Sequence, residues 1–312
     1  MRILLLCNSD SLAIPAVIEM QKKGNLVAVG VTEKSGKILI PTLTSVGVEQ
    51  ENIYTLNNKN FAVTLTQLIK DYQVEVVFVM TFPWKLPSSV LALPGKGCIN
   101  FHFGLLPKYK GTDPVFWQLK NMEQKGGISV HRMTEEIDEG PILLIDELPV
   151  IPGETFGIHC QRLGTLNSST VNKVIELLKQ NEQPQIIQND QTGNYFKAPD
   201  RNDLTISWKT QSADEIEWLI NATNPRYGGA LTTIRQMQVS ILEVSPASVN
   251  MDANNPQEIV PGTIVYADMV YGLIVACLNK QFLKINIVHT TEGYLSGTKL
   301  FSLGFNTGET FY

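Results

Sequence analysis

Runs of apolar residues recur along the first half of the chain at the spacing of alternating strands and helices. The runs at 2–7, 26–31 and 74–80 consist mainly of aliphatic residues, which is typical of strands buried on both faces of a sheet. Between them, 12–22 and 61–72 place their apolar residues on one face of a helix. We therefore predict an α/β fold, with a Rossmann-like, mostly parallel sheet and flanking helices. The same patterns predict further strands at 97–102, 128–133 and 142–150, and helices at 114–121 and 155–178.

The second half of the chain has a different pattern. Residues 183–203 are rich in Asn, Gln, Asp, Gly and Pro, a composition that is typical of linkers. A helical stretch follows at 213–224, and beyond it short alternating runs are separated by Gly, Pro and Asn, as in a small antiparallel barrel. These runs are 231–235, 238–244, 262–266, 272–277 and 282–288. We therefore expect a first domain over 1–182, a linker over 183–203 and a β-barrel domain over 204–312.

The central predicted strand ends in two hydrogen-bonding side chains. Asn100 and His102 are separated by one residue, so the two-residue period of a strand puts them on the same face. Gly104, Pro107 and Gly111 then interrupt regular structure and predict a tight loop. In an open α/β sheet, ligands bind outside the carboxyl ends of the strands. This pair is therefore the first candidate site.

An acidic loop at 131–141 supplies a third group, Asp138. A single histidine is most often structural, and an Asp before Glu-Gly-Pro most often caps a loop. We nevertheless assign Asp138 to the site, because an amide, an imidazole and a carboxylate together suit catalysis better than any one of them alone. The other acidic side chains of the loop are interpreted as solvated charges, and the other histidines receive no role. These residues are Glu135, Glu136, Glu139, His131, His159 and His289.

These residues and their neighbours resemble the folate-dependent formyltransferases. The match consists of Asn100, His102, the run Leu-Leu-Pro-Lys-Tyr-Lys-Gly at 105–111, and Asp138, in this order and at the family's spacing. Two later segments are similar to the linker and carboxyl-terminal domain of methionyl-tRNA formyltransferases and related sugar formyltransferases. They are 196–199, before Ile-Ser-Trp, and 224–230. The resemblance therefore spans nearly the whole chain.

The resemblance implies an architecture and a reaction. The first domain would be the formyltransferase catalytic domain, and the barrel would be OB-like. The enzyme would transfer a formyl group from 10-formyltetrahydrofolate, its co-substrate, to a primary amine, and would need no metal. Asn100 would donate an N–H to the formyl oxygen, and a protonated or polarised His102 would stabilise the same oxygen. Asp138 would raise the pKa of His102 and accept the amine proton.

The resemblance also places the folate. In the family, the loop that corresponds to 80–87 holds the folate ring system, partly through backbone groups. The residues that we assign to the co-substrate pocket are Phe82, Trp84, Lys85, Leu86, Leu105 and Ile137. The alternative for Phe82 and Trp84 is that their rings only close the edge of the hydrophobic core.

Charge narrows the choice of amine acceptor. The chain has 25 basic and 30 acidic residues, a net charge of -5, and the range 204–312 is acidic as well, which does not favour nucleic acid. Members that formylate methionyl-tRNA usually carry a longer loop rich in Arg, Lys and Gly after the second strand. Here 31–38 predicts a short loop with two lysines and no arginine. We expect a small or carrier-linked amine, such as a nucleotide-linked amino sugar or an aminoacyl group, with initiator methionyl-tRNA as the alternative.

Other functional classes fit the sequence less well. A dinucleotide-binding domain requires a glycine-rich turn after the first strand, and 7–11 contains no glycine. Hydrolysis of 10-formyltetrahydrofolate is a further alternative, but such hydrolases usually carry an amino-terminal regulatory domain, which we do not expect here. A binding module that had lost activity would lack the catalytic residues.

The expected compartment follows from the lack of a membrane-spanning or signal segment in the sequence. No apolar run is long enough to span a bilayer, and the first residues enter a strand directly, so we expect a cytoplasmic protein. The four cysteines are scattered without the spacing of a zinc site or a disulfide framework.

Overall fold

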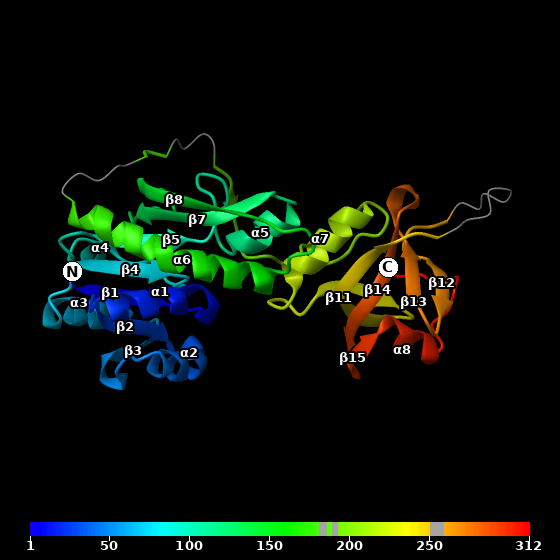
Figure 1. Cartoon of the computed structure of the whole chain (residues 1–312), viewed down its shortest axis with the longest axis horizontal. Helices are drawn as coiled ribbons and strands as arrows, with labels where there is room; N and C mark the ends of the chain where they lie inside the picture. Colours follow the sequence, from blue (N-terminus) through cyan, green and yellow to red (C-terminus); the bar gives the residue numbers. More distant parts are fainter. Residues whose placement is uncertain (181–185, 189–192, 250–258) are drawn as a thin grey trace. The chain divides into compact units, whose positions relative to one another are not determined.

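The computed structural model of the chain describes residues 1–180, 186–188, 193–249 and 259–312. Its contacts divide it into two compact units (Figure 1). The first comprises 1–114, 125–149 and 160–197, and the second comprises 115–124, 150–159 and 198–312. Two short segments of the second unit thus lie within the range predicted for the catalytic domain. No helix in these described parts is both long and apolar enough to cross a membrane, and the cytoplasmic location stays a prediction.

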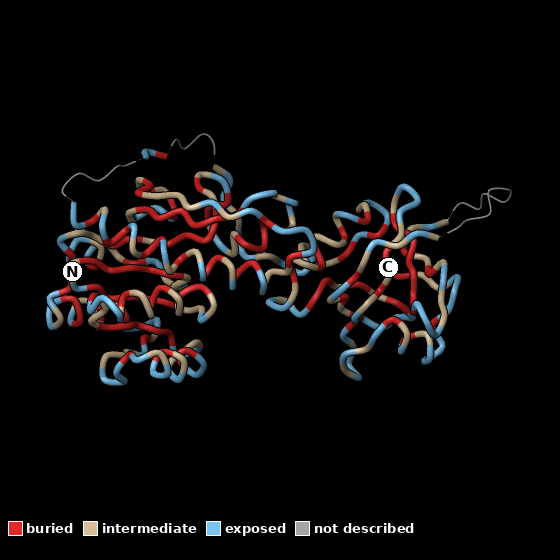
Figure 2. The backbone as a smooth tube through the Cα atoms, viewed as in Figure 1, coloured by how far each residue is buried: buried red, intermediate tan, exposed pale blue. Residues whose placement is uncertain are grey.

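A seven-stranded sheet forms the centre of the first unit. Its strands are β1 (Ile3–Cys7), β2 (Leu26–Thr32), β3 (Ile53–Leu56), β4 (Val76–Met80), β5 (Cys98–His102), β7 (Lys125–Arg132) and β8 (Ile142–Pro149). They are arranged in the order β3-β2-β1-β4-β5-β7-β8. The first five in this order run parallel, and β7 and β8 are antiparallel to their neighbours. Every residue of β1 and β4 is buried, as expected for strands covered on both faces (Figure 2). The predicted mostly parallel sheet is confirmed.

Helices flank this sheet, and one of them replaces a predicted loop. They are α1 (Asp10–Lys22), α2 (Glu33–Ser45), α3 (Phe61–Asp71), α4 (Ser88–Leu91) and α6 (Phe156–Lys179). The short loop predicted at 31–38 is wrong, because α2 begins at Glu33, directly after β2. The Thr32 side chain accepts a hydrogen bond from the Ser35 N–H and so caps the helix. Leu39 and Leu43 are buried one turn apart, which is the spacing of an apolar helix face.

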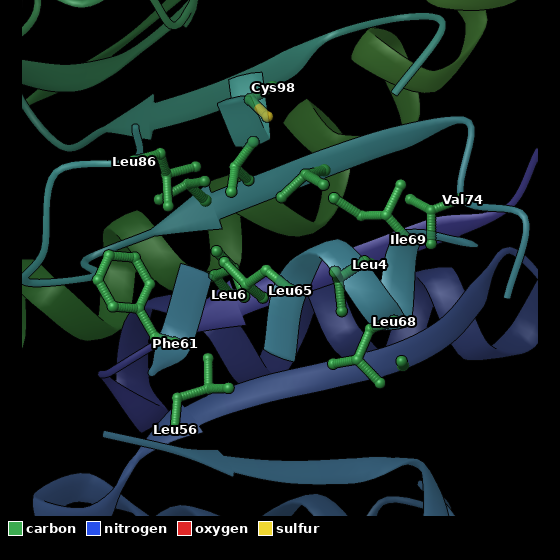
Figure 3. Packing of buried hydrophobic residues seen from close by; sticks show 14 residues of the cluster. Leu4, Leu6, Leu56, Phe61, Leu65, Leu68, Ile69, Val74, Leu86 and Cys98 are labelled. Carbon is green, nitrogen blue, oxygen red and sulfur yellow. The ribbon is translucent and has the colours of Figure 1, made fainter. Parts of the chain in front are cut away.

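A cluster of apolar side chains packs α3 against the sheet (Figure 3). Leu4 and Leu6 come from one face of β1, and Leu65 and Leu68 come from the inner face of α3. Leu86, from the segment that follows β4, is 1% exposed and belongs to the same cluster. This core therefore fixes the position of the segment at 80–87, which is predicted to hold folate.

The second unit contains a six-stranded antiparallel sheet. Its strands are β10 (Ala230–Ile234), β11 (Met237–Ala247), β12 (Ile264–Asp268), β13 (Gly272–Ala276), β14 (Phe282–Thr290) and β15 (Gly293–Ser296), and the helices of this part of the chain are α5 (Pro114–Lys120), α7 (Ala213–Thr223) and α8 (Gly297–Ser302). The long strand β14 pairs with β11, β13 and β15. Ser212 and Glu215 form a capping box that begins α7. The predicted antiparallel second domain is confirmed, whereas β15 and α8 were not predicted.

Part of the predicted linker at 183–203 is built into the first unit. The two-residue strands β6 (Lys110–Gly111) and β9 (Tyr195–Phe196) form a parallel pair. Ile186 and Ile142 form an isolated antiparallel bridge. Residues 183–185 and 189–192 of the predicted linker lie outside the described residues. The described linker residues up to 197 therefore belong with the catalytic segment and not with the second unit.

Candidate active site

Three side chains that the sequence predicted to act together meet at the carboxyl end of β5. Asn100 and His102 lie on this strand, and Asp138 reaches both of them from the loop between β7 and β8. Asn100 Nδ2 donates to Asp138 Oδ1 over 3.3 Å. His102 Nδ1 lies 3.5 Å from the other carboxylate oxygen, Oδ2. One buried carboxylate is thus shared between an amide donor and an imidazole.

Backbone geometry holds the Asp138 carboxylate in this position. Asp138 has a φ of 56°, in the left-handed region, and it is 7% exposed. Its Oδ2 accepts a hydrogen bond of 2.8 Å from the Gly111 N–H. Gly111 has a φ of +96°, and a Cβ at this position would lie 2.3 Å from the carbonyl oxygen of Phe196. A glycine is therefore required where β6 presents its N–H to the carboxylate.

The loop after β5 fixes the ring of His102. His102 Nε2 donates to the carbonyl of Tyr109 over 2.8 Å, which leaves Nδ1 directed at Asp138. A Cβ at Gly104 would lie 2.9 Å from His102 Nε2, so this glycine makes room for the ring. Ser129, opposite His102 in the β5–β7 pairing, donates to the Gly104 carbonyl over 2.7 Å. The buried serine therefore ties the loop to the neighbouring strand.

The pKa values of both titrating groups are shifted. Burial by itself would raise the pKa of Asp138, but its contacts with His102, His131 and the Gly111 N–H hold that pKa well below its usual range. Burial lowers the pKa of His102, and it outweighs the opposing effect of the Asp138 charge. Asp138 thus acts on His102 in the predicted direction, yet the net shift is downward. Each of the two groups thus favours the charged form of the other, and burial opposes both charges.

His131, to which the sequence assigned no role, joins the site. It is 2% exposed, and its Nε2 lies 3.1 Å from Asn100 Nδ2 and 3.3 Å from Asp138 Oδ1. Its Nδ1 donates to the carbonyl of Arg132 over 3.0 Å, so Nε2 is free to accept the Asn100 amide hydrogen. His131 lies directly opposite Asn100 in the antiparallel pairing of β5 with β7. This register is the signal that identifies it, and the register is fixed only once the two strands are paired.

Comparison with known proteins assigns the chain to a family. The model of the formyl transferase family matches residues 1–175, and that of the formyl transferase C-terminal domain matches 200–302. The chain belongs to the formyl transferase family. It is a folate-dependent N-formyltransferase that uses 10-formyltetrahydrofolate, and the predicted enzyme class and co-substrate are confirmed.

Relatives of this formyl transferase include methionyl-tRNA formyltransferases. The chain is 28% identical to that of Nitrosospira multiformis over 232 residues, which are 74% of this chain and 71% of the relative. It is 36% identical to that of Alkaliphilus oremlandii over 157 residues, 50% of each chain.

Solved structures of a sugar formyl transferase and of a protein bound to tetrahydrofolic acid share the fold. The sugar 3N-formyl transferase WlaRD, crystallised with dTDP and 5-N-formyl-THF, gives a TM-score of 0.65 at 16% identity, over 91% of this chain and 96% of WlaRD. HypX from Aquifex aeolicus, in complex with tetrahydrofolic acid, gives 0.63 at 13% identity. The match with HypX covers 97% of this chain and 47% of HypX, so the formyl transferase spans about half of that protein.

The residues predicted to hold folate in the loop after β4 differ in how they can do so. Phe82 and Trp84 are partly buried, and their rings pack on Phe61 with centroid distances of 6.1 and 5.1 Å. Part of each ring therefore serves the core, as the alternative interpretation proposed. Leu86 is 1% exposed as a whole residue and lies in the core, whereas Lys85 is exposed. Their binding of folate stays a prediction.

The other two residues predicted to hold folate lie on different loops, Leu105 on the loop after β5 and Ile137 on the loop between β7 and β8. Ile137 is 48% exposed directly before the buried Asp138. Leu105 is half-buried, and its Cδ2 would lie 2.7 Å from a Cβ at Gly127 of β7. A hydrogen bond of 2.6 Å from Ser88 Oγ to Glu135 Oε1 joins the loop after β4 to the loop of Asp138. The two loops predicted to contact folate are therefore neighbours.

Glu139 is not the solvated charge that the sequence predicted. Its Oε2 accepts a hydrogen bond of 2.7 Å from Nζ of Lys110, a lysine that is only 3% exposed. A buried ammonium requires such a partner, which explains the difference. The other histidines lie elsewhere: His159 is 3.4 Å from Glu154, and His289 stacks on Tyr294. Within the described ranges, no three His, Cys, Asp or Glu side chains gather as metal ligands would.

Proposed function

We propose that Asn100, His102 and Asp138 transfer the formyl group of 10-formyltetrahydrofolate to the primary amine of a small or carrier-linked acceptor, such as a nucleotide-linked amino sugar. The observation that carries this proposal is the contact of one carboxylate with both the Asn100 amide and the His102 imidazole. Formyl transfer needs a hydrogen-bond donor for the developing oxyanion and an acceptor for the amine proton. These three side chains supply both.

In the first step, the uncharged amine nitrogen forms a bond to the formyl carbon. The electron pair of the C=O double bond moves to the oxygen, which becomes an oxyanion. Asn100 donates an amide hydrogen to this oxygen, although both of its hydrogens already have partners, His131 at 3.1 Å and Asp138 at 3.3 Å. We infer that it gives up the longer contact. Asp138 Oδ1 is then free to receive a proton as the oxyanion forms.

In the second step, the attacking nitrogen, which is now an ammonium, loses a proton to Asp138. A lowered pKa makes Asp138 a weak base, so it holds this proton only briefly before the proton moves on to the departing folate nitrogen. The oxyanion then re-forms its double bond, the bond to the folate nitrogen breaks, and that nitrogen keeps the electron pair and takes up a proton. His102 Nδ1, 3.5 Å from the carboxylate, is placed to share the travelling proton. The products are an N-formyl acceptor and tetrahydrofolate.

Three features support an acceptor smaller than tRNA. Helix α2, which occupies the place of the loop expected to grip tRNA, contains Lys34 and Lys37 and no arginine. The range 204–312 holds six basic and nine acidic residues. This excess of acidic residues does not favour binding to the phosphates of tRNA, which depends on Lys and Arg. The similarity to WlaRD extends over almost the full length of both chains.

Methionyl-tRNA is the second candidate acceptor. It is supported by the methionyl-tRNA formyltransferases, which resemble this chain in sequence over about three quarters of its length. The antiparallel second unit does not decide the matter, because such folds host many functions.

Release of tetrahydrofolate from 10-formyltetrahydrofolate tests the proposal. One reaction contains charged initiator tRNA, a second contains a panel of nucleotide-linked amino sugars, and a third contains no amine. Turnover only with a sugar supports the proposed acceptor, turnover only with tRNA supports the second candidate, and turnover without amine indicates a hydrolase. Asp138→Asn, which keeps the shape and removes the charge, should lower kcat by a factor of about 1,000. An active Asp138→Asn enzyme would refute the catalytic assignment.

A further inference from the structure

A side chain from the predicted linker contacts the backbone of the catalytic loop. Gln188 is 8% exposed, and its Nε2 donates to the carbonyl of Asp138 over 2.9 Å and to the carbonyl of Gly140 over 2.8 Å. An amide nitrogen carries two hydrogens, so both donors of Gln188 are used on the same loop. The identity of the two partners, both carbonyl oxygens, fixes which end of the amide faces them.

The strand pairing explains how a residue so far along the chain reaches this loop. Ile142 begins β8, directly after the catalytic loop, and Ile186 exchanges two backbone hydrogen bonds with it, each of 2.9 Å. This bridge places Gln188 beside the loop. At Gly140 the end of the loop passes close to its beginning at Arg132. A Cβ at Gly140 would lie 1.7 Å from the carbonyl oxygen of Arg132, so this position requires glycine.

Asp138 is therefore held at two points. Its carboxylate accepts hydrogen bonds from the Gly111 N–H and the Asn100 amide, and its own carbonyl accepts one from Gln188. The backbone between these points has the left-handed φ of 56°, a conformation that non-glycine residues keep only when their surroundings support it. Loss of the Gln188 bonds would leave the loop carbonyls without their donor and let the carboxylate shift relative to His102.

We propose that Gln188 is a positioning residue for catalysis, which acts by holding the Asp138 loop in its productive conformation. The inference rests on the proposed role of Asp138. Gln188 itself does not touch the reacting atoms. The described part of the linker is, on this view, a structural component of the active site.

Two substitutions test this inference. Gln188→Glu keeps the shape but places an acceptor against two carbonyls, and Gln188→Met keeps the length without any donor. Both should lower kcat by up to about 100-fold, the effect of a displacement of roughly 1 Å, while KM for 10-formyltetrahydrofolate stays within about threefold. Ile187→Ala, at a neighbouring side chain that is 84% exposed, is the matched control and should leave both constants unchanged. The assay follows tetrahydrofolate release with the acceptor that is turned over in the panel above.

Hydrogen–deuterium exchange supplies a readout that needs no acceptor. Peptides covering 133–141 should exchange faster in both Gln188 variants, and peptides from β1 and β4 should be unchanged, which also shows that the variants are folded. Unchanged exchange at 133–141, or kcat within about threefold of the parent enzyme in both variants, overturns the inference. If Asp138→Asn is inactive while the Gln188 variants are active, only the role of Gln188 fails. If Asp138→Asn is itself active, the proposed catalytic role of Asp138 is refuted, and the inference about Gln188, which rests on it, is refuted as well.

Discussion

Asn100 Nδ2 and His131 Nε2 lie 3.1 Å apart, across the antiparallel pair of β5 and β7. His131 donates its Nδ1 hydrogen to the backbone carbonyl of Arg132, so the lone pair of Nε2 is directed at the amide. An asparagine that serves as an oxyanion donor must present its nitrogen and not its oxygen. His131 enforces this orientation, because only the nitrogen end of the amide can donate to it.

Replacing His131 should therefore impair catalysis through Asn100. His131→Leu removes the acceptor at Nε2 and allows the amide to rotate, and we expect kcat to fall by about 10- to 100-fold with a small change in KM. His289→Leu, at an exposed histidine of the second unit, serves as the control. Steady-state kinetics of both variants provide the measurement, and equal kcat values would show that Asn100 needs no partner.

Gly104 should tolerate no side chain, because the ring of His102 occupies the space that a side chain would need. An added Cβ would lie 2.9 Å from His102 Nε2 and 2.7 Å from Pro114 Cβ, closer than such atoms approach in folded proteins. Gly104→Ala should lower the free energy of unfolding by about 1–3 kcal/mol and reduce kcat as well. Gly95→Ala is the matched control, because a Cβ there meets nothing within 4 Å. Urea unfolding of the two variants compares them directly, and equal midpoints would contradict the crowding argument.

Acid should destabilise the enzyme partly through His102. Its folded-state pKa lies below its usual value of 6.5, so below that pH the unfolded chain takes up a proton that the folded chain refuses. The contribution of His102 to the free energy of unfolding is complete above pH 6.5. It is lost as the pH falls through the folded pKa, by at most about 1.4 kcal/mol per pH unit. The lowered pKa of Asp138 acts in the same direction at more acid pH.

Unfolding by urea at neutral pH and at about pH 5 tests this linkage. The parent enzyme should lose more stability between the two conditions than His102→Gln, which cannot titrate at this position. His289→Gln should behave like the parent enzyme. A His102→Gln enzyme that loses as much stability as the parent would rule out His102 as a source of the acid sensitivity.

Ile137 offers a test of the predicted folate pocket. It is 48% exposed although it precedes a buried residue, and an apolar side chain held at the surface beside Asp138 suits contact with an aromatic ring system. Ile137→Ser should raise KM for 10-formyltetrahydrofolate by about tenfold and leave kcat within about threefold. Ile151→Ser, at a side chain that is 50% exposed in the second unit, should change neither constant. An unchanged KM in the Ile137 variant would remove this residue from the pocket.

Local patterns were sufficient to predict much of the fold and the central part of the site. The strands β1 and β4 are continuous apolar runs, and the two-residue period of a strand was enough to place Asn100 and His102 on one face. Helix α2 was missed for a local reason. Gly36 and Pro41 interrupt its sequence and resemble a loop, whereas the Thr32 cap and buried leucines show that it is a helix.

Other residues were missed because their partners are distant in sequence. His131 acquires its role from Asn100, 31 residues earlier, and Gln188 acquires its role from Asp138, 50 residues earlier. Neither relationship leaves a local pattern, since each depends on which strands pair and in what register. The buried Lys110, which turns Glu139 from a solvated charge into a partner, is a further contact of this kind.

The pairing of β6 with β9 has a consequence for how the enzyme is made and how it can be divided. When the ribosome has synthesised the chain through α6, the site residues on β5, on β7 and in the loop after β7 are present. Gln188 and β9 (Tyr195–Phe196) have not yet been synthesised. The loops that carry Gly111 and Asp138 therefore reach their final form only after the chain has grown well past them. A fragment that stops at residue 182 would contain every proposed catalytic side chain but lack β9, the strand that pairs with β6. A minimal catalytic fragment must instead extend through Phe196.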